Sequence, residues 1–343
     1  MSSPVRKIVF EQYGGPEVVK LVTAELPAPG KHEVQVKILY AGLGGSDIQM
    51  RNGTYPMQKA APLTPGYVFV GRVYSTGKGV KNFNKGDLVC SLSKYDAQAE
   101  RANFPETYLI PLPQGFHDLQ QAVPLILDWT TAYGMVYRTA QIKKGMRVFI
   151  HGLSGAVGAA LFKLCQLEGA EIYGTASQSN HAELIAQGAH PFVYTDKNWM
   201  KAMQDIGGAH VVFDALGFES YDESWEILAK GKDGGGHLIG YGGNLKLLNG
   251  EKAESQNWSN AKLLAKGLVP FCPWKSSFFY IDRDQKTFQP ELQKLFQLSM
   301  EGKIHVPIKK VWELEEVPEA HRTWAQSKGN GSHVVHISDE VPF

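Results

Sequence analysis

The clearest indication of the fold class comes from Val148-Phe149-Ile150-His151-Gly152-Leu153-Ser154-Gly155-Ala156-Val157-Gly158. An apolar strand runs into glycines three residues apart, and a helix is predicted to follow directly. The first turn of a helix has unpaired backbone N–H groups and a partial positive charge, so it attracts a pyrophosphate. Gly155 would let the backbone approach the phosphates, and Gly158 would let the helix pack closely on the strand. The stretch therefore predicts a dinucleotide-binding turn.

The spacing is a variant of the common dinucleotide pattern. G-x-G-x-x-G needs a glycine where this chain has Leu153, so the motif is G-x-x-G-x-x-G. A glycine-rich turn with only a structural role is the alternative interpretation. A serine nucleophile at Ser154 is disfavoured, because Ala156 stands where the G-x-S-x-G elbow has its last glycine.

Strands and helices alternate around and after this turn, which is typical of a parallel sheet covered on both faces. The expected strands are Arg147–His151, Glu171–Ala176, Pro191–Tyr194, Val211–Ala215 and His237–Tyr241. The expected helices are Ala156–Glu168, Ala182–Gln187, Trp199–Ile206, Tyr221–Leu228 and Pro290–Glu301. The polar stretch 243–260 is predicted to be a surface loop.

The first third of the chain has a different pattern. Short segments rich in β-branched and aromatic residues are separated by glycine and proline turns, which favours a small barrel or sandwich. The segments are Lys7–Phe10, Glu33–Leu39, Tyr67–Tyr74, Asp87–Leu92 and Thr107–Pro111. Gln120–Tyr137 has helical spacing, and Gly331–Ile337 is predicted to be a closing strand.

Length and composition limit the classes of protein to which the chain can belong. The chain has 343 residues, enough for two domains of roughly 150 residues. A net charge of +1 gives no support to a nucleic-acid binder or a polybasic membrane-surface protein. No apolar run approaches the length of about 18 residues that spans a bilayer. Three distant cysteines cannot form a disulfide framework, so we expect a cytoplasmic protein.

The end of the second predicted strand bears on cofactor choice. In NAD-binding proteins a carboxylate about 20 residues after the glycines holds the ribose hydroxyls. The stretch Gly174–His181 contains no carboxylate, and its hydroxyls and His181 are compatible with a 2′-phosphate. This favours NADPH, although the usual lysine or arginine is also missing. Thr175 and Ser177 as ordinary turn residues are the alternative interpretation.

Several motifs, taken in order, resemble the medium-chain dehydrogenase/reductase superfamily and its zinc-free quinone oxidoreductase-like branch. They are Tyr13–Glu17, Ala41–Asp47, Thr64–Tyr67, Lys85–Asp87, His151–Gly158, Asp214–Gly217 and Glu301–Ile304. The resemblance implies an α/β protein of two domains. Residues 1–124 and 297–343 would form a GroES-like β-rich catalytic domain, and residues 125–296 a Rossmann domain whose doubly wound parallel sheet binds NADP(H). It also implies an active site between the domains and a homodimer joined through an edge strand.

The same resemblance argues against a metal. Zinc-bearing relatives have a cysteine at the position of Gly44 and a His-Glu pair at Tyr67-Val68. They also carry a four-cysteine lobe in the region after Cys90, where this chain has no cysteine before Cys165. A catalytic zinc needs about three protein ligands. We therefore expect no metal site.

The implied reaction is hydride transfer from NADPH to an activated C=C bond of an enone or enal, or to a quinone. The substrate would be a small hydrophobic carbonyl compound or quinone. Tyr67 is our candidate hydrogen-bond donor, with packing inside the β-rich domain as the alternative. Gly44, Tyr55 and Phe278 are candidates to line the substrate pocket, and Asp47 is expected to orient its loop. Quinone reductases usually have an asparagine where this chain has Gly44, so we expect a roomier pocket here.

The resemblance and the predicted strand ends also nominate cofactor contacts. They are Thr131, Ser154, Gly155, Ala156, Val157, Ser177, His181, Tyr194, Leu216, Gly217, Tyr241 and Gly242. Two other functions stay open: an enoyl-thioester reductase acting in trans for a biosynthetic synthase, and a non-catalytic NADPH-binding protein.

Overall fold

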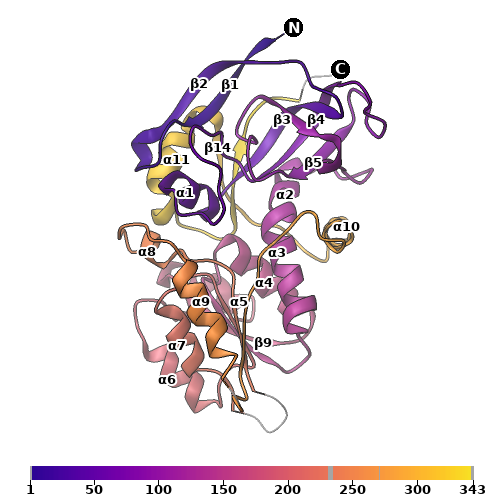
Figure 1. Cartoon of the computed structure of the whole chain (residues 1–343). Coiled ribbons are helices and arrows are strands. Elements are labelled where there is room, and N and C mark those ends of the chain that lie inside the picture. The colour runs from indigo at the N-terminus through magenta and orange to yellow at the C-terminus, as the bar shows by residue number, and fades with distance from the viewer. Residues whose placement is uncertain (1, 231–234, 270, 341–343) are drawn as a thin grey trace. The chain divides into compact units, whose positions relative to one another are not determined.

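The computed structural model describes residues 2–230, 235–269 and 271–340. The chain divides into two compact units (Figure 1). The first unit comprises Met1–Thr130, Asp282–Lys328 and Ser332–Phe343, and the second comprises Thr131–Ile281 with Gly329–Gly331. In sequence, the second unit is thus inserted into the first.

The first unit is built on a seven-stranded sheet of order β14-β15-β3-β4-β5-β7, with β6 also paired to β3. Its strands are β3 (Glu33–Leu43), β4 (Val68–Thr76), β5 (Leu88–Leu92), β6 (Arg101–Pro105), β7 (Ile110–Pro111), β14 (Ile308–Glu313) and β15 (Ser332–His336). The β14–β15 pair is parallel and the other pairs are antiparallel. Val34, Val36 and Ile38 of β3 are fully buried, so the core of this unit lies against β3.

A separate antiparallel ribbon and several short helices complete the first unit. The ribbon pairs β1 (Ser3–Phe10) with β2 (Val19–Leu26). The α-helices are α1 (Gly45–Asn52), α2 (Leu119–Pro124), α10 (Phe288–Met300) and α11 (Val317–Thr323). The 3-10 turns are η1 (Pro16–Val18), η2 (Glu106–Tyr108), η6 (Leu314–Glu316) and η7 (Trp324–Gln326), and η3 (Leu125–Trp129) is a π-helical segment. Helix α3 (Thr130–Tyr133) and the π-helical segment η4 (Gly134–Ala140) lead into the second unit.

The second unit is built on a six-stranded sheet of order β10-β9-β8-β11-β12-β13. All of its pairs are parallel. Its strands are β8 (Arg147–His151), β9 (Glu171–Ala176), β10 (His190–Val193), β11 (Val211–Asp214), β12 (His237–Gly240) and β13 (Lys275–Phe278). The order reverses between β8 and β11, and ligands of doubly wound folds bind at such a switch point.

Helices cover this parallel sheet. They are α4 (Ala156–Leu167), η5 (Gln178–Asn180), α5 (His181–Ala186), α6 (Asn198–Asp205), α7 (Ser220–Glu226), α8 (Leu245–Leu248) and α9 (Asn257–Lys266). Helices α6, α7 and α9 lie on the same side of the sheet in Figure 1, and Trp199, Tyr221 and Leu263 from these helices share one buried core. Helix α4 contacts β8 and β9, and its Leu161 and Leu164 are fully buried. The predicted fold class, a β-rich part with a doubly wound parallel-sheet part, is confirmed.

The prediction of a surface loop over residues 243–260 is wrong. Helix α8 and the first turn of α9 lie in this stretch. The stretch is polar, but Ser259 of α9 and Gln256, the residue that caps the helix, are buried. The hydroxyl of Ser259 accepts a hydrogen bond from the backbone N–H of Phe218, at 2.7 Å. Because polar side chains pack inward here, the spacing of apolar residues does not show the helical periodicity.

The predicted strand Thr107–Pro111 is mostly a turn. Only Ile110 and Pro111 pair with β5, while Glu106–Tyr108 form the 3-10 turn η2. The Glu106 carboxylate accepts hydrogen bonds from the backbone of Lys81 and Asn82, which holds the chain in this turn. The sequence pattern also missed strands β2, β6, β13 and β14 and helices α1, α8, α9 and α11.

Candidate active site

The glycine-rich turn joins β8 to α4 as predicted. Gly152 has φ +75°, a left-handed conformation that favours glycine. A Cβ added to Gly158 would lie 2.0 Å from the Gly152 carbonyl oxygen, so the helix approaches the turn as closely as a glycine permits. Gly174 on β9 is equally constrained, because its Cβ would lie 2.1 Å from the Ile150 oxygen. The turn thus brings backbone, not side chains, to the end of the sheet.

The N-terminus of α4 offers free donors to a ligand. Gly155 caps the helix in an extended conformation with no side-chain hydrogen bond. The next amides belong to Ala156 and Val157, in the first turn of the helix, where backbone N–H groups lack helical partners. Ser154 lies in the same turn, and its carbonyl accepts a hydrogen bond from Gly331 N. The glycine-rich turn, the helix dipole and these amide donors together fit a pyrophosphate.

The end of β9 lies beside the end of β10. Val193 pairs with Ala176, so Tyr194 and Ser177 follow at the same edge of the sheet. Ser177 accepts a hydrogen bond from the Asn180 side chain, at 3.2 Å. His181 begins α5, and its Nε2 lies 3.4 Å from the Ala176 carbonyl oxygen. These predicted adenosine contacts therefore lie at the same edge of the sheet.

The turns after β11 and β12 touch each other. A Cβ on Gly242 would lie 2.7 Å from the Ala215 oxygen, and Gly217 has φ +72°. The carboxylate of Asp214 accepts hydrogen bonds from Leu216 N at 2.7 Å and from Gly217 N at 3.1 Å. Tyr241 N donates to the Asp214 carbonyl. Four predicted cofactor contacts thus meet at the carboxyl edge of the parallel sheet.

In the first unit, a buried carboxylate organises the loop around Gly44. Asp47 is 1% exposed and accepts backbone hydrogen bonds from Gly44 at 2.9 Å and Gly66 at 3.1 Å. Burial raises the pKa of Asp47 to about 6, although these hydrogen bonds oppose the rise. A Cβ at Gly44 would meet nothing within 4 Å. Asp47 therefore has the contacts of a loop-orienting residue, and the space beside Gly44 is open.

Tyr67 forms a pair with Tyr55. Their hydroxyl oxygens lie 2.8 Å apart, and their rings meet edge to face with centroids 5.9 Å apart. Tyr67 is 2% exposed, whereas Tyr55 is half-buried. Two of the predicted substrate-side residues are therefore linked by a hydrogen bond in the first unit.

Thr131 and Phe278 belong to the second unit. Thr131 is buried in α3, and the half-buried Phe278 packs against the core that Trp199 shares with its neighbours. The next residue, Phe279, contacts Gly134, whose Cβ would lie 2.6 Å from the ring. Phe278, a candidate for the substrate pocket, thus packs against the core of the second unit. It belongs to a stretch rich in aromatic residues, 269–280, in which Pro270 lies outside the described residues.

The donor set does not fit a zinc ion at the family position. Gly44 has no side chain, Val68 is apolar, and the Tyr67 hydroxyl is paired with Tyr55. Over residues 2–230, 235–269 and 271–340, no group of three or more histidine, cysteine, aspartate or glutamate residues is placed to hold a metal ion.

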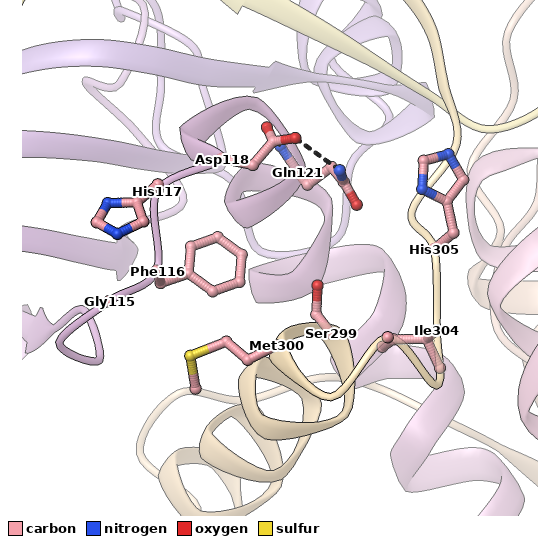
Figure 2. A pocket seen from close by; sticks show the side chains of 10 residues that line it. Gly115, Phe116, His117, Asp118, Gln121, Ser299, Met300, Ile304 and His305 are labelled. Carbon is pink, nitrogen blue, oxygen red and sulfur yellow. Dashed lines mark hydrogen bonds between the residues drawn. The ribbon is translucent and has the colours of Figure 1, made fainter.

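A separate hollow lies in the first unit. Its volume is about 430 Å³, and its walls come from the segment before α2, from α2 itself and from the end of α10. Figure 2 shows Asp118 and Gln121 hydrogen-bonded at the start of α2, with Ser299 and Met300 on α10 across the hollow. None of the predicted site residues lines it.

In the described part of the chain, no helix has the length and apolar character of a membrane span.

Family models match most of the chain in two pieces. The model described as "Alcohol dehydrogenase GroES-like domain" matches residues 30–114. The model described as "Zinc-binding dehydrogenase" matches residues 187–335. A GroES-like sheet combined with a Rossmann unit defines the class of nicotinamide-dependent medium-chain oxidoreductases.

Two relatives are informative. A rat quinone oxidoreductase is 31% identical over 234 residues, covering 66% of this chain and 71% of the relative. The rat "Synaptic vesicle membrane protein VAT-1 homolog" is 29% identical over 345 residues, covering 96% of this chain and 83% of the relative. The chain belongs to the medium-chain dehydrogenase/reductase superfamily, in the branch of the quinone oxidoreductases.

Solved structures share the fold over nearly the full length. The JamJ enoyl reductase in its apo form superposes with a TM-score of 0.82 and 25% identity, covering 98% of this chain and 100% of that one. Mycobacterial Rv1454c complexed with NADPH gives a TM-score of 0.80 and 22% identity, covering 97% and 99%. The protein is therefore an oxidoreductase whose Rossmann unit binds a nicotinamide cofactor.

Proposed function

We propose that this protein is an NADPH-dependent, zinc-independent reductase that transfers hydride to an activated C=C bond or to a quinone. The observation that carries the cofactor choice is the end of β9. Ser177 and His181 stand there, beside Tyr194 from the adjacent strand, and Asn180 donates to Ser177. A 2′-phosphate needs donors at this edge, whereas NAD needs a carboxylate for the ribose hydroxyls.

The Tyr55–Tyr67 pair is the proposed source of the hydrogen bond to substrate. Hydride addition at the β-carbon of an enone or enal moves negative charge onto the carbonyl oxygen. A positioned hydroxyl donor stabilises this charge in the transition state. One of the two hydroxyls donates a hydrogen bond to the other over 2.8 Å. This hydrogen bond polarises the O–H of the accepting hydroxyl, which is the group proposed to donate to the substrate.

Zinc-independence rests on the residues at the family ligand positions. Gly44 and Val68 offer no ligand atom, so an alkoxide would lack its usual Lewis acid. Reduction of a conjugated C=C bond or a quinone does not need one, because charge spreads over a conjugated system. This supports a reductase acting on activated acceptors.

An enoyl thioester is the second candidate substrate. The open space at Gly44 would admit a bulkier group than a site with a side chain at that position. The likeness to an enoyl reductase structure supports the same candidate. Both substrate classes share the chemistry of hydride addition to a C=C bond beside a carbonyl group.

The cofactor proposal is tested by fluorescence titration with NADPH and NADH. We expect tighter binding of NADPH, and a Ser177→Asp variant should reverse the preference, because its carboxylate repels the 2′-phosphate and accepts ribose hydroxyls. Gln293→Glu, on the exposed face of α10 in the first unit, adds the same charge and should leave both affinities unchanged. Equal affinities in the unaltered protein would contradict the cofactor choice but not the reductase function.

The substrate proposal is tested by NADPH consumption with an enone, a quinone and an enoyl thioester. Tyr55→Phe and Tyr67→Phe should each lower kcat by about 100-fold, at the lower end of what a positioned acid or donor contributes. Their affinity for NADPH should stay unchanged. Tight NADPH binding without turnover of any acceptor would instead favour a non-catalytic binding protein.

Assembly and location complete the proposal. Strand β13 is the last strand on one side of the parallel sheet, so its outer edge can pair with a second copy. Near β13 in sequence, Leu268 is 80% exposed and Phe271 is 104% exposed. Such exposed apolar side chains would be buried if a second copy covered them. Light scattering should report a dimer that Phe271→Asp weakens. Three free cysteines are compatible with the reducing cytoplasm.

A further inference from the structure

A chain of buried side chains in the second unit connects two turns at the carboxyl edge of the sheet. His151, the last residue of β8, lies at its centre. Its Nε2 is 3.0 Å from the Ser224 hydroxyl, and its Nδ1 is 3.3 Å from the Thr175 hydroxyl. Ser224 in turn donates to Asp214 Oδ2 over 2.7 Å. At the other end, the Thr175 hydroxyl accepts from the backbone N–H of Gly152, over 3.1 Å.

The partners fix the direction of every hydrogen bond. Since the Ser224 proton goes to the Asp214 carboxylate, the Ser224 oxygen must accept from His151, so Nε2 carries the proton. Nδ1 of the neutral ring is then an acceptor, and the Thr175 hydroxyl donates to it. Each donor in the chain, from the Gly152 amide to the Ser224 hydroxyl, makes one of these hydrogen bonds. The chain ends at the Asp214 carboxylate, which accepts.

The surroundings keep the ring neutral. His151 is 3% exposed and lies edge-on to Trp199, with ring centroids 5.2 Å apart. Burial lowers the pKa of His151, against the opposing charge of Asp214. Thr175 is 2% exposed, and Ser224 and Asp214 are fully buried. The chain is therefore shielded from water, where hydrogen bonds are strong and broken ones are costly.

We infer that His151 is a positioning residue for the nicotinamide dinucleotide, because it holds the phosphate-binding turn and the Leu216–Gly217 turn in a fixed relation. On one side the chain ties down Gly152, the glycine whose left-handed conformation begins the turn. On the other side, Asp214 uses its second oxygen to hold the amides of Leu216 and Gly217. Breaking the centre of the chain loosens both turns together.

The inference rests on dinucleotide binding by this unit, and it predicts an unequal loss along the ligand. NADPH is long enough to use both turns, whereas 2′,5′-ADP contains only the adenosine half. His151→Leu removes both hydrogen bonds of the ring, so we expect a rise in the NADPH Kd of about tenfold or more. The Kd of 2′,5′-ADP should rise by less than about threefold.

Two further variants separate positioning from general damage. Gln at position 151 retains one donor and one acceptor, so His151→Gln should recover most of the NADPH affinity. Ser224→Ala cuts the link to Asp214 and leaves the imidazole in place, so it should weaken NADPH binding in the same direction. It also serves as the test if His151→Leu fails to fold.

The matched control is His237, a half-buried histidine that begins β12 at the opposite end of the same sheet. Its Nε2 lies 2.9 Å from the Ser277 hydroxyl. His237→Leu should lower the melting temperature but leave both Kd values unchanged. An unchanged NADPH Kd in His151→Leu and Ser224→Ala, or an equal loss in His237→Leu, would overturn the inference. If the unaltered protein binds no nucleotide, the proposed function itself fails.

A spectroscopic measurement tests the proton assignment directly. Long-range ¹H–¹⁵N spectra should show His151 as the neutral Nε2–H tautomer from pH 6 to pH 8. The opposite tautomer, or a protonated ring in this range, would contradict the direction of the hydrogen-bond chain.

Discussion

Two strand-to-helix turns, one in each unit, are led by glycine for different physical reasons. In the second unit the turn from β8 to α4 uses Gly152 and Gly158, and a Cβ at Gly158 would lie 2.0 Å from backbone oxygen. In the first unit the turn from β3 to α1 uses Gly44, where a Cβ would meet nothing within 4 Å. Gly158 is required by packing, whereas Gly44 leaves space.

Under the proposed function, the turn from β8 to α4 would serve the cofactor and the turn from β3 to α1 would serve the substrate. A pyrophosphate is the same in every dinucleotide, so a turn built on close backbone contact suits it. A substrate varies, and a turn with open space beside it can accept a new side chain without moving the backbone. Each unit nevertheless has a buried aspartate that accepts two backbone amides, Asp47 at the turn from β3 to α1 and Asp214 at the turn that follows β11.

The strongest contrast is expected when one glycine of each turn is replaced with alanine. Gly158→Ala forces the helix away from Gly152, so the NADPH Kd should rise by about 10- to 100-fold, corresponding to about 1–3 kcal/mol of overpacking. Gly44→Ala has room and an extended backbone, with φ −154°, so it should change neither stability nor NADPH binding. Titration and thermal unfolding of both variants check this. Equal effects of the two substitutions would remove the contrast.

The intermediate effect concerns Asp47 and pH. Its folded-state pKa of about 6 lies above the ordinary value of 3.8, so the folded chain keeps a proton that the unfolded chain has lost between these values. The contribution of Asp47 to stability therefore falls as pH rises from about 4 to about 6, and stays constant above that. Asp47→Asn does not titrate. Relative to it, the unaltered protein should lose about 3 kcal/mol over this range.

Urea unfolding at pH 4, 5, 6 and 7 measures this difference. The variant also lacks one acceptor for the two amides, so we expect it to be less stable by about 1 kcal/mol at pH 4. A difference in free energy of unfolding that does not change with pH would show that Asp47 is already ionised at pH 4.

The smallest expected effect on stability tests the open space itself. Gly44→Asn should change the free energy of unfolding by less than about 0.5 kcal/mol, because nothing is displaced. The NADPH Kd should stay the same, while the preference among enone, quinone and enoyl thioester should shift toward the quinone. A large loss of stability would mean that the space is needed by the fold rather than by the substrate.

The second unit could be predicted from sequence more closely than the first. Strands β8 and β9 begin and end where expected, because buried parallel strands are apolar runs bounded by glycine and helix signals. Strands β2, β6 and β14 of the first unit were missed. Their half-exposed patterns depend on partners far away in sequence, such as Val311 of β14 opposite Val334 of β15.

The candidate site shows the same limit. Glycines of the phosphate turn are recognisable from local spacing alone. The role of His151 is not, because its partners Thr175 and Ser224 come from β9 and α7. A retrospective signal exists in Asp214, Ser220 and Ser224, since two serines four residues apart on one helix face both donate to the carboxylate that ends β11.

The order of the chain has a consequence for synthesis on the ribosome. Strand β3 pairs with β15, with His333 opposite Leu43, so part of the first sheet must wait until β15 has been translated. All six strands of the second sheet, from Arg147 to Phe278, are made before β14 and β15. The nucleotide-binding unit can therefore close while the surrounding unit is incomplete. A nascent chain released before β15 would expose the Tyr40–Leu43 edge of β3, a template for aggregation.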